Sequence, residues 1–181
     1  AGQGIAYSLF YDGRLLLKPS RIALHTDLPE ADHWENIRIT GTKQRHVSET
    51  VQAPFYRVKE FGIDCNELEL RLNNGFSLLM RAYNDGMAYR FVAGRKGEMT
   101  VVEERAEFNF ADDFEAYIPY STNPKDPWNM AFQNFYTKAP LTQYNTELPA
   151  FLPLTVDAGA VKLTLLESDL EAYPGMFVRG D

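Results

Sequence analysis

Residues 68–91 read LELRLNNGFSLLMRAYNDGMAYRF, and this stretch decides the fold. Apolar residues recur at alternate positions around two turn-forming triplets, as strands at 68–72, 76–83 and 87–91 and turns at 73–75 and 84–86. A period of two is typical of a half-buried β-strand, and Asn and Gly tolerate the positive φ angles of tight turns. The stretch therefore predicts a three-stranded antiparallel meander.

A further hairpin is predicted near the N-terminus, where Ile5, Tyr7 and Leu9 alternate before Asp12-Gly13, and Leu15 to Leu17 follow on the return strand. Other candidate strands, separated by Gly, Asn, Asp and Pro, lie at residues 37–40, 100–110, 115–119, 132–137, 151–156 and 161–166. No window keeps the i, i+3, i+4, i+7 apolar spacing of an amphipathic helix with caps at both ends. We therefore predict an all-β chain, folded as a two-sheet antiparallel β-sandwich.

The composition predicts one folded domain over residues 1–181. Of these residues, 45% are hydrophobic, and the length allows a core without disulfides, which the single Cys65 could not form internally. The formal net charge of -7 and the absence of a basic block argue against nucleic acid as a partner. No apolar run approaches the roughly 20 residues of a membrane-spanning helix.

The sequence lacks the motifs of several common catalytic and metal sites. His25, His33 and His46 do not have the spacing of zinc ligands, and there is no phosphate-binding loop, dinucleotide fingerprint or nucleophile elbow. Two acidic clusters, at residues 103–107 and 112–115, are expected to be solvated carboxylates at strand edges or in turns.

A third acidic cluster consists of Glu167, Asp169 and Glu171 and follows the predicted strand at 161–166. In an extended chain the three carboxylates share one face, and in a helix Glu167 and Glu171 still do. Their oxygens would suit Ca²⁺. The alternative is a solvated acidic edge, and the spacing alone favours this alternative.

Aromatic residues are plentiful, and most are expected to fill the space between the two sheets. Trp34 and Trp128 each lie beside a turn-like segment. These two side chains are therefore the candidates for stacking on a sugar ring.

Three segments resemble the N-terminal domain of glycoside hydrolase family 97, a group of calcium-dependent α-glucosidases and α-galactosidases. They are RAYNDGMAYRF at residues 81–91, EFNF at residues 107–110, and a closing segment at residues 152–176 that contains LPLT, LESDL and YPGM. The order and the approximate spacing of the segments also fit that family.

The resemblance implies a galactose-mutarotase-like supersandwich, incomplete at its edges, that precedes a catalytic (β/α)₈ barrel outside these residues. It implies that this chain holds no catalytic residue. It also implies that barrel carboxylates hold most of a Ca²⁺ ion, which Glu167 reaches from the sandwich, while Asp169 and Glu171 are structural. The implied partners are an oligosaccharide substrate and the C-terminal barrel, and the implied location is the periplasm or the cell exterior.

A single carboxylate cannot supply the six to eight oxygens that Ca²⁺ takes. We therefore expect the isolated chain to hold calcium weakly or not at all and to be inactive, whereas the resemblance implies that its full-length parent is a glycoside hydrolase. Two alternatives remain open. One is a free-standing carbohydrate-binding module that uses Trp34 or Trp128, and the other is a structural or protein-binding sandwich with an exposed apolar patch.

Overall fold

The computed structural model describes residues 4–53, 57–123, 125–128, 134–168, 170 and 173–180. The chain folds as two compact units, one formed by Ala1–Tyr7 with Pro19–Phe108 and the other by Ser8–Lys18 with Asn109–Asp181. The prediction of one domain over residues 1–181 stays a prediction.

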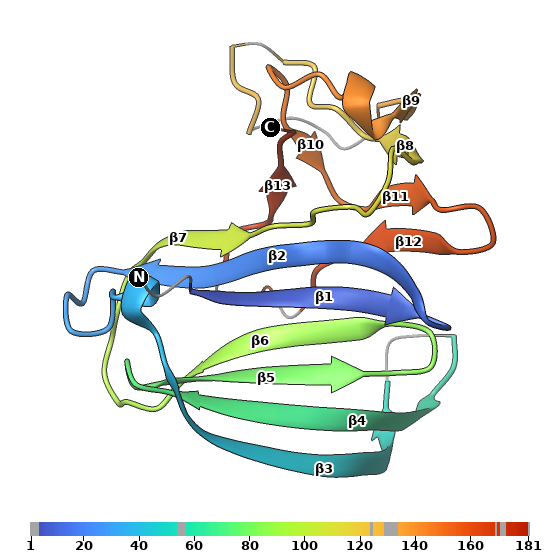
Figure 1. Cartoon of the computed structure of the whole chain (residues 1–181). Coiled ribbons are helices and arrows are strands. Elements are labelled where there is room, and N and C mark those ends of the chain that lie inside the picture. Colours follow the sequence, from blue (N-terminus) through green and yellow to red (C-terminus); the bar gives the residue numbers. More distant parts are fainter. Residues whose placement is uncertain are drawn as a thin grey trace. The chain divides into compact units, whose positions relative to one another are not determined.

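The first unit is built from two sheets (Figure 1). One has the order β1-β2-β7, from strands Ile5–Tyr11, Arg14–Thr26 and Val101–Ala106, and parts of β1 and β2 belong to the second unit. The other has the order β3-β4-β5-β6, from Ile39–Gln52, Glu60–Leu72, Phe76–Ala82 and Met87–Ala93. Aromatic rings from both sheets meet, since the centroids of Tyr7 in β1 and Tyr89 in β6 are 6.3 Å apart.

The predicted meander is confirmed. β4 pairs with β5 so that Leu70 is opposite Leu78, and β5 pairs with β6 so that Leu78 is opposite Phe91. Gly75 in the first turn has a φ of 83°, where an L side chain would be strained. The Asn74 side chain accepts a hydrogen bond from the backbone N–H of Phe76 at 3.2 Å. These turn residues hold a register that places Leu70, Leu78 and Phe91 in one row on the same face.

Trp34 belongs to the core of the first unit. It begins the single-turn 3₁₀ helix η1 (Trp34–Asn36), and only 4% of the residue is exposed. Its ring centroid is 5.3 Å from that of Phe91, and its Nε1 donates a hydrogen bond to the carbonyl oxygen of Leu24 at 2.5 Å. The prediction that Trp34 stacks on sugar is therefore wrong, because the ring is enclosed and its polar atom has its partner inside the protein.

Strand β3 is much longer than its sequence indicated. The pattern predicted a strand at residues 37–40, whereas β3 pairs with β4 from Ile39 opposite Leu72 to Gln52 opposite Glu60. Most of β3 is exposed and polar, so the apolar alternation that marks a half-buried strand is missing. Side-chain pairs between β3 and β4 stabilise the strand instead: Arg45 contacts Glu67 at 2.6 Å, and Gln52 donates a hydrogen bond to Glu60 at 2.8 Å.

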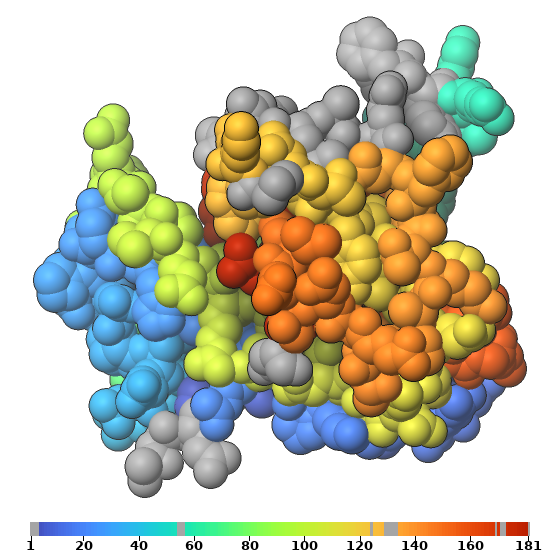
Figure 2. Space-filling model, turned by 90° about the horizontal axis from the view of Figure 1, so that it is seen from above, coloured from blue at the N-terminus to red at the C-terminus, as the bar shows by residue number. Residues whose placement is uncertain are grey.

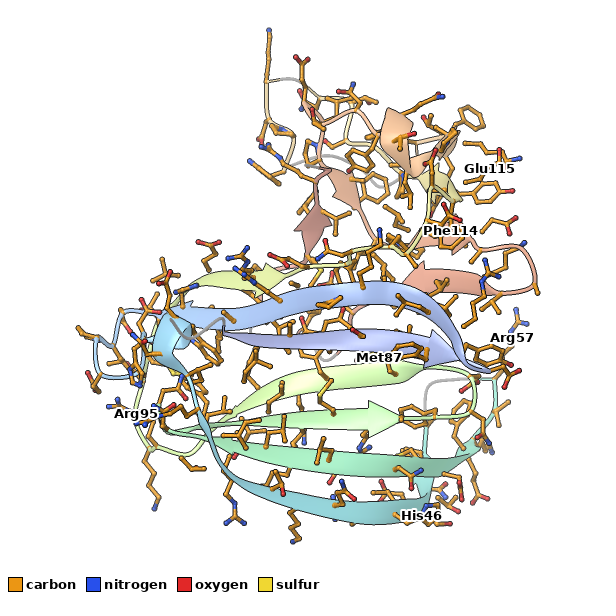
Figure 3. The ribbon with its side chains drawn as sticks, viewed as in Figure 1. His46, Arg57, Met87, Arg95, Phe114 and Glu115 are labelled. Atoms are coloured by element: carbon orange, nitrogen blue, oxygen red, sulfur yellow. The ribbon has the colours of Figure 1, made fainter. Side chains whose placement is uncertain are left out.

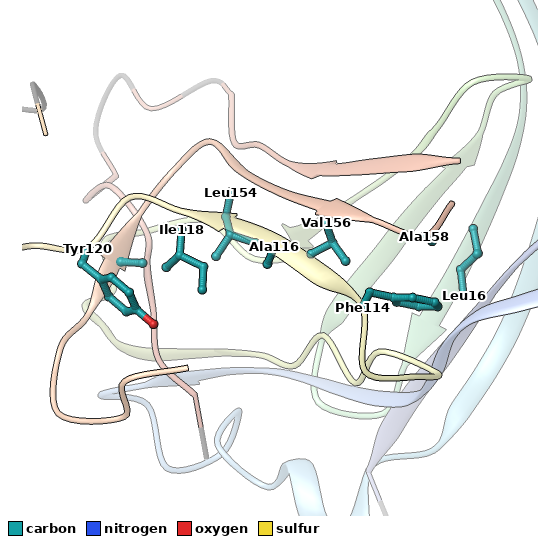
Figure 4. Close-up of a cluster of buried hydrophobic side chains, with 9 residues drawn as sticks. Leu16, Phe114, Ala116, Ile118, Tyr120, Leu154, Val156 and Ala158 are labelled. Carbon is teal, nitrogen blue, oxygen red and sulfur yellow. The ribbon is translucent and has the colours of Figure 1, made fainter. Parts of the chain in front are cut away.

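The second unit is built on short strands. One sheet has the order β12-β11-β8-β9, from Lys162–Leu165, Leu154–Asp157, Glu115–Ile118 and Thr137–Pro140. The other pairs β10 (Ala150–Phe151) with β13 (Phe177–Val178), and the single-turn helix η2 (Leu141–Gln143) follows β9. Figure 4 shows a core cluster of buried side chains, which are Leu16, Phe114, Ala116, Ile118, Tyr120, Ala150, Leu154, Val156 and Ala158.

The all-β fold class is confirmed. Every ladder between named strands for which a register is known is antiparallel, and helix within the described ranges is limited to the two 3₁₀ turns. The predicted strands at 115–119, 151–156 and 161–166 correspond to β8, β10 with β11, and β12. The strand predicted at 132–137 is wrong where it can be checked, because residues 134–136 are not in a strand and β9 begins only at Thr137; residues 132–133 lie outside the described residues. Among the helices of the described residues, none has the length and apolar character needed to cross a membrane.

We predict that the substitution Leu78→Ala lowers the free energy of unfolding by about 2–5 kcal/mol, because Leu78 is fully buried and the change leaves a cavity. Val102→Thr in β7 is the matched control, since Val102 is 68% exposed, and its effect should stay within about 0.5 kcal/mol. Urea unfolding followed by circular dichroism measures both. Equal effects of the two substitutions would contradict this placement of the core.

Candidate functional site

Glu167 follows β12 and is tied to the segment that leads into β13. Its side chain belongs to a partly buried residue, and both carboxylate oxygens accept the backbone N–H of Met176, at 3.0 Å for Oε1 and 2.8 Å for Oε2. A carboxylate has about four lone-pair directions, so one N–H leaves acceptor capacity free. The bond therefore orients the Glu167 carboxylate without using all of its acceptor capacity.

The donor of this bond is fixed by its position beside β13. Met176 immediately precedes Phe177, which pairs with Phe151, while Val178 pairs with Ala150. The Tyr144 hydroxyl donates a hydrogen bond to the carbonyl oxygen of Val178 at 3.0 Å. Burial raises the pKa of the Tyr144 hydroxyl, so the phenol stays protonated and keeps donating at ordinary pH.

Trp128 lies against the same terminal segment. It is 54% exposed, and its ring centroid is 4.9 Å from that of Phe177, with the two ring planes at 89°. The guanidinium carbon of Arg179 lies over the Trp128 ring, 5.4 Å from the centroid. Unlike Trp34, Trp128 is therefore an exposed aromatic side chain, as the sequence predicted.

The described residues hold no group of three or more His, Cys, Asp or Glu side chains that could bind a metal ion. Of the acidic cluster predicted from the sequence, Glu167 is described, whereas Asp169 and Glu171 lie outside the described residues. The three histidines belong to the first unit, whereas Glu167 belongs to the second. His25 contacts Asp32 at 2.6 Å, and His46 lies on β3 (Figure 3).

The other two acidic clusters lie in strands and turns, as predicted. Glu104 accepts a hydrogen bond from the hydroxyl of Tyr89 at 3.1 Å, and Glu107 accepts one from the backbone N–H of Arg21 at 2.9 Å. Asp113 accepts two hydrogen bonds from Thr142. Glu115, shown in Figure 3 at the start of β8, contacts Lys138 at 2.8 Å. These carboxylates all have structural partners.

One buried charged group was missed by the sequence analysis. Glu67 on β4 is only 7% exposed and lies between Arg45 on β3, at 2.6 Å, and Arg81 on β5, at 2.8 Å. Arg45 and Glu67 border a groove with a volume of about 340 Å³. Hydrogen bonds from Arg45 and then Arg81 lower the pKa of Glu67 to about 2. Only the strand register could have revealed this triad, because its members are 14 and 22 residues from Glu67 in sequence.

The sequence profile described as Glycosyl-hydrolase 97 N-terminal matches residues 1–181, which is the whole chain. The chain belongs to this family. A relative from Bacteroides thetaiotaomicron, named retaining alpha-galactosidase, is 39% identical over 98% of the chain. A second relative, from Streptomyces bingchenggensis, is named probable retaining alpha-galactosidase and is 27% identical over 73% of the chain.

The domain covers 28% and 21% of the lengths of these two relatives, so it spans about a quarter of each. Solved structures share its fold. A glycoside hydrolase family 97 enzyme from Pseudoalteromonas sp. strain K8, in complex with acarbose, superposes with a TM-score of 0.67 at 17% identity, over 85% of this chain and 24% of that one. A beta-arabinopyranosidase gives a TM-score of 0.68 at 20% identity, over 86% of this chain and 28% of that one.

We predict that in the Glu67→Gln variant the free energy of unfolding falls less between pH 4.5 and 2 than in the parent chain. The pKa of Glu67 is depressed from 4.5 to about 2 in the folded protein, so its stabilisation is complete above pH 4.5 and is lost as the pH falls toward 2. At neutral pH the substitution should cost about 1.5–3 kcal/mol, because it removes charge-assisted hydrogen bonds from two arginines.

Urea unfolding at several pH values between 2 and 7 measures this dependence. The control is Glu115→Gln, which removes an exposed ion pair with Lys138 and should leave the curve close to that of the parent chain. A curve for Glu67→Gln that stays parallel to the parent curve would contradict the proposed linkage.

Proposed function

We propose that the chain is the non-catalytic N-terminal domain of a glycoside hydrolase that acts on α-galactosides or α-glucosides. In this proposal the domain walls the active site and donates Glu167 to a Ca²⁺ site that a C-terminal (β/α)₈ barrel completes. The α-galactoside is the better supported substrate, because both relatives named above are described as retaining or probable retaining alpha-galactosidases. The observation that carries the metal proposal is the fixed orientation of the Glu167 carboxylate.

The donor chemistry at Glu167 fits one part of a calcium site. Carboxylate oxygen is a hard ligand of the kind that Ca²⁺ takes, and one carboxylate supplies at most two of the six to eight oxygens. Other ligands must therefore come from outside the described residues of this domain. When bound, the ion would act as a Lewis acid and polarise the oxygens of the glycosidic region.

The chain's own contribution is to hold the ligand in place before the metal binds. The Met176 N–H restrains both carboxylate oxygens, and a Cβ at Gly175 would be in ordinary van der Waals contact with Oε1 of Glu167, at 3.5 Å. A restrained ligand loses less conformational entropy on binding than a mobile one. The segment at residues 173–176 therefore serves as the support of the proposed metal ligand.

A periplasmic or extracellular location also belongs to this proposal. It rests on the family resemblance and on an oligosaccharide as substrate. Fractionation of the native host, with marker enzymes for each compartment, tests the location. Recovery of the protein with the cytoplasmic marker would contradict it.

We predict that the 181-residue chain does not hydrolyse an aryl α-galactoside or aryl α-glucoside, with or without added Ca²⁺. The reason is that the proposed acid, base or nucleophile, and most calcium ligands belong to the barrel. Release of nitrophenol from each substrate, followed by absorbance, measures this activity. Turnover that co-purifies with the chain and depends on its concentration would contradict the proposal.

We predict that Glu167→Gln in the full-length enzyme weakens calcium binding about tenfold or more and lowers α-glycosidase activity in parallel. The amide keeps the size of the side chain and one oxygen acceptor for Met176, but it removes the negative charge. Calorimetry with Ca²⁺ and a rate assay measure the two effects. Glu115→Gln is the control, because Glu115 is an exposed carboxylate of the same unit. Unchanged calcium affinity in the Glu167 variant would overturn the assignment.

A further inference from the structure

Trp128 is an exposed aromatic residue on an anchored loop of the second unit. The carbonyl oxygen of the preceding Pro127 accepts a hydrogen bond from the hydroxyl of Ser121 at 2.6 Å, and Ser121 is fully buried. The backbone N–H of Ser121 in turn donates to the carbonyl oxygen of Pro149 at 2.8 Å. The backbone just before Trp128 is therefore hydrogen-bonded to a buried residue, although 54% of Trp128 is exposed.

The Trp128 ring contacts two residues of the terminal segment. Phe177 lies in β13, and Arg179 directly follows that strand. Phe177 meets the indole at 89°, and Arg179 lies over the ring. Figure 2 shows the chain end, in dark red, at the surface among residues in gold and orange from positions near 120 to 150. With both contacts in place, Trp128 is still 54% exposed.

This arrangement has the properties of a stacking platform. One face of a pyranose ring consists mainly of C–H groups, which are attracted to the electron-rich face of an indole. A ring already held by Phe177 and Arg179 loses little conformational entropy when a ligand packs on it. Arg179 also carries several N–H donors beside the platform, where sugar hydroxyls and ring oxygens can accept them.

We propose that the exposed part of the Trp128 indole binds a hexopyranose ring of an α-linked oligosaccharide. The choice of sugar rests on the proposed function, because the chain belongs to a glycoside hydrolase family. The platform itself involves neither calcium nor Glu167. It is a binding site of this domain alone, in addition to the single metal ligand proposed above.

The test is a titration of the 181-residue chain with melibiose, in the presence of a calcium chelator. The chain has two tryptophans, and Trp34 is buried, so the exposed Trp128 should report the ligand in the fluorescence. We expect a saturable change with a dissociation constant on the order of 1 mM, the weak end of specific affinities. Mannitol, which has no pyranose ring, is the control titrant and should cause no saturable change.

Three variants locate the site, and saturation-transfer NMR on the melibiose protons follows binding where fluorescence is lost. Trp128→Ala should weaken binding at least tenfold, and Arg179→Gln should weaken it by about threefold to tenfold. Phe135→Ala is the matched control, because Phe135 is a fully exposed aromatic residue of the same unit and its removal should leave the affinity unchanged.

Binding of melibiose to Trp128→Ala with unchanged affinity would overturn the proposal, as would the absence of a saturable response in the parent chain. A Trp128 emission that shifts with protein concentration and not with melibiose would identify a protein as the occupant, and this too would overturn it. Because the chelator removes calcium throughout, neither outcome depends on Glu167, so the two proposals fail separately.

Discussion

The register of β4 is the constraint on which the first unit depends. This strand pairs with β3 on one side and with β5 on the other. Its side chains alternate between the two faces of the sheet, so its register decides which residues lie on each face. Leu70 faces Leu78, whereas Glu67, three residues away, points to the opposite face, where Arg45 and Arg81 stand directly across from it. A slip of one residue would move the leucines outward and the buried carboxylate into the apolar core, at a large cost in free energy.

In the second unit the short strand β13 has a comparable role. Two residues form few ladder bonds, so a strand of this length needs support from side chains, and the hydroxyl of Tyr144 provides it at Val178. The residue before the strand, Met176, holds Glu167, and the residues at positions 177 and 179 hold Trp128. The proposed metal ligand Glu167 and the proposed stacking residue Trp128 are far apart in sequence, and both contact the segment around β13.

The sequence predicted well those features that follow from short-range physics. The turn triplets at 73–75 and 84–86 and the alternation around them were sufficient for the meander, because period and turn chemistry act within a few residues. β3 was underestimated because an exposed edge strand needs no apolar period, and its stability comes from partners on β4. Trp34 was assigned wrongly because a neighbouring turn does not reveal the aromatic cluster that encloses the ring. The triad of Arg45, Glu67 and Arg81 depends on a register across three strands, which one sequence does not display.

The buried Glu67 and the partly buried Glu167 differ in whether a positive charge lies beside the carboxylate. Glu67 already has two guanidinium groups within hydrogen-bonding distance, so a cation brought to it would meet two positive charges and would have to displace them. Glu167 is held by a neutral backbone N–H, and within the described residues it makes no ion pair with a lysine or arginine. Its negative charge is therefore left for a partner from elsewhere. Burial alone would favour Glu67 as the functional group, whereas the missing charge partner is the reason for choosing Glu167 in the proposed function.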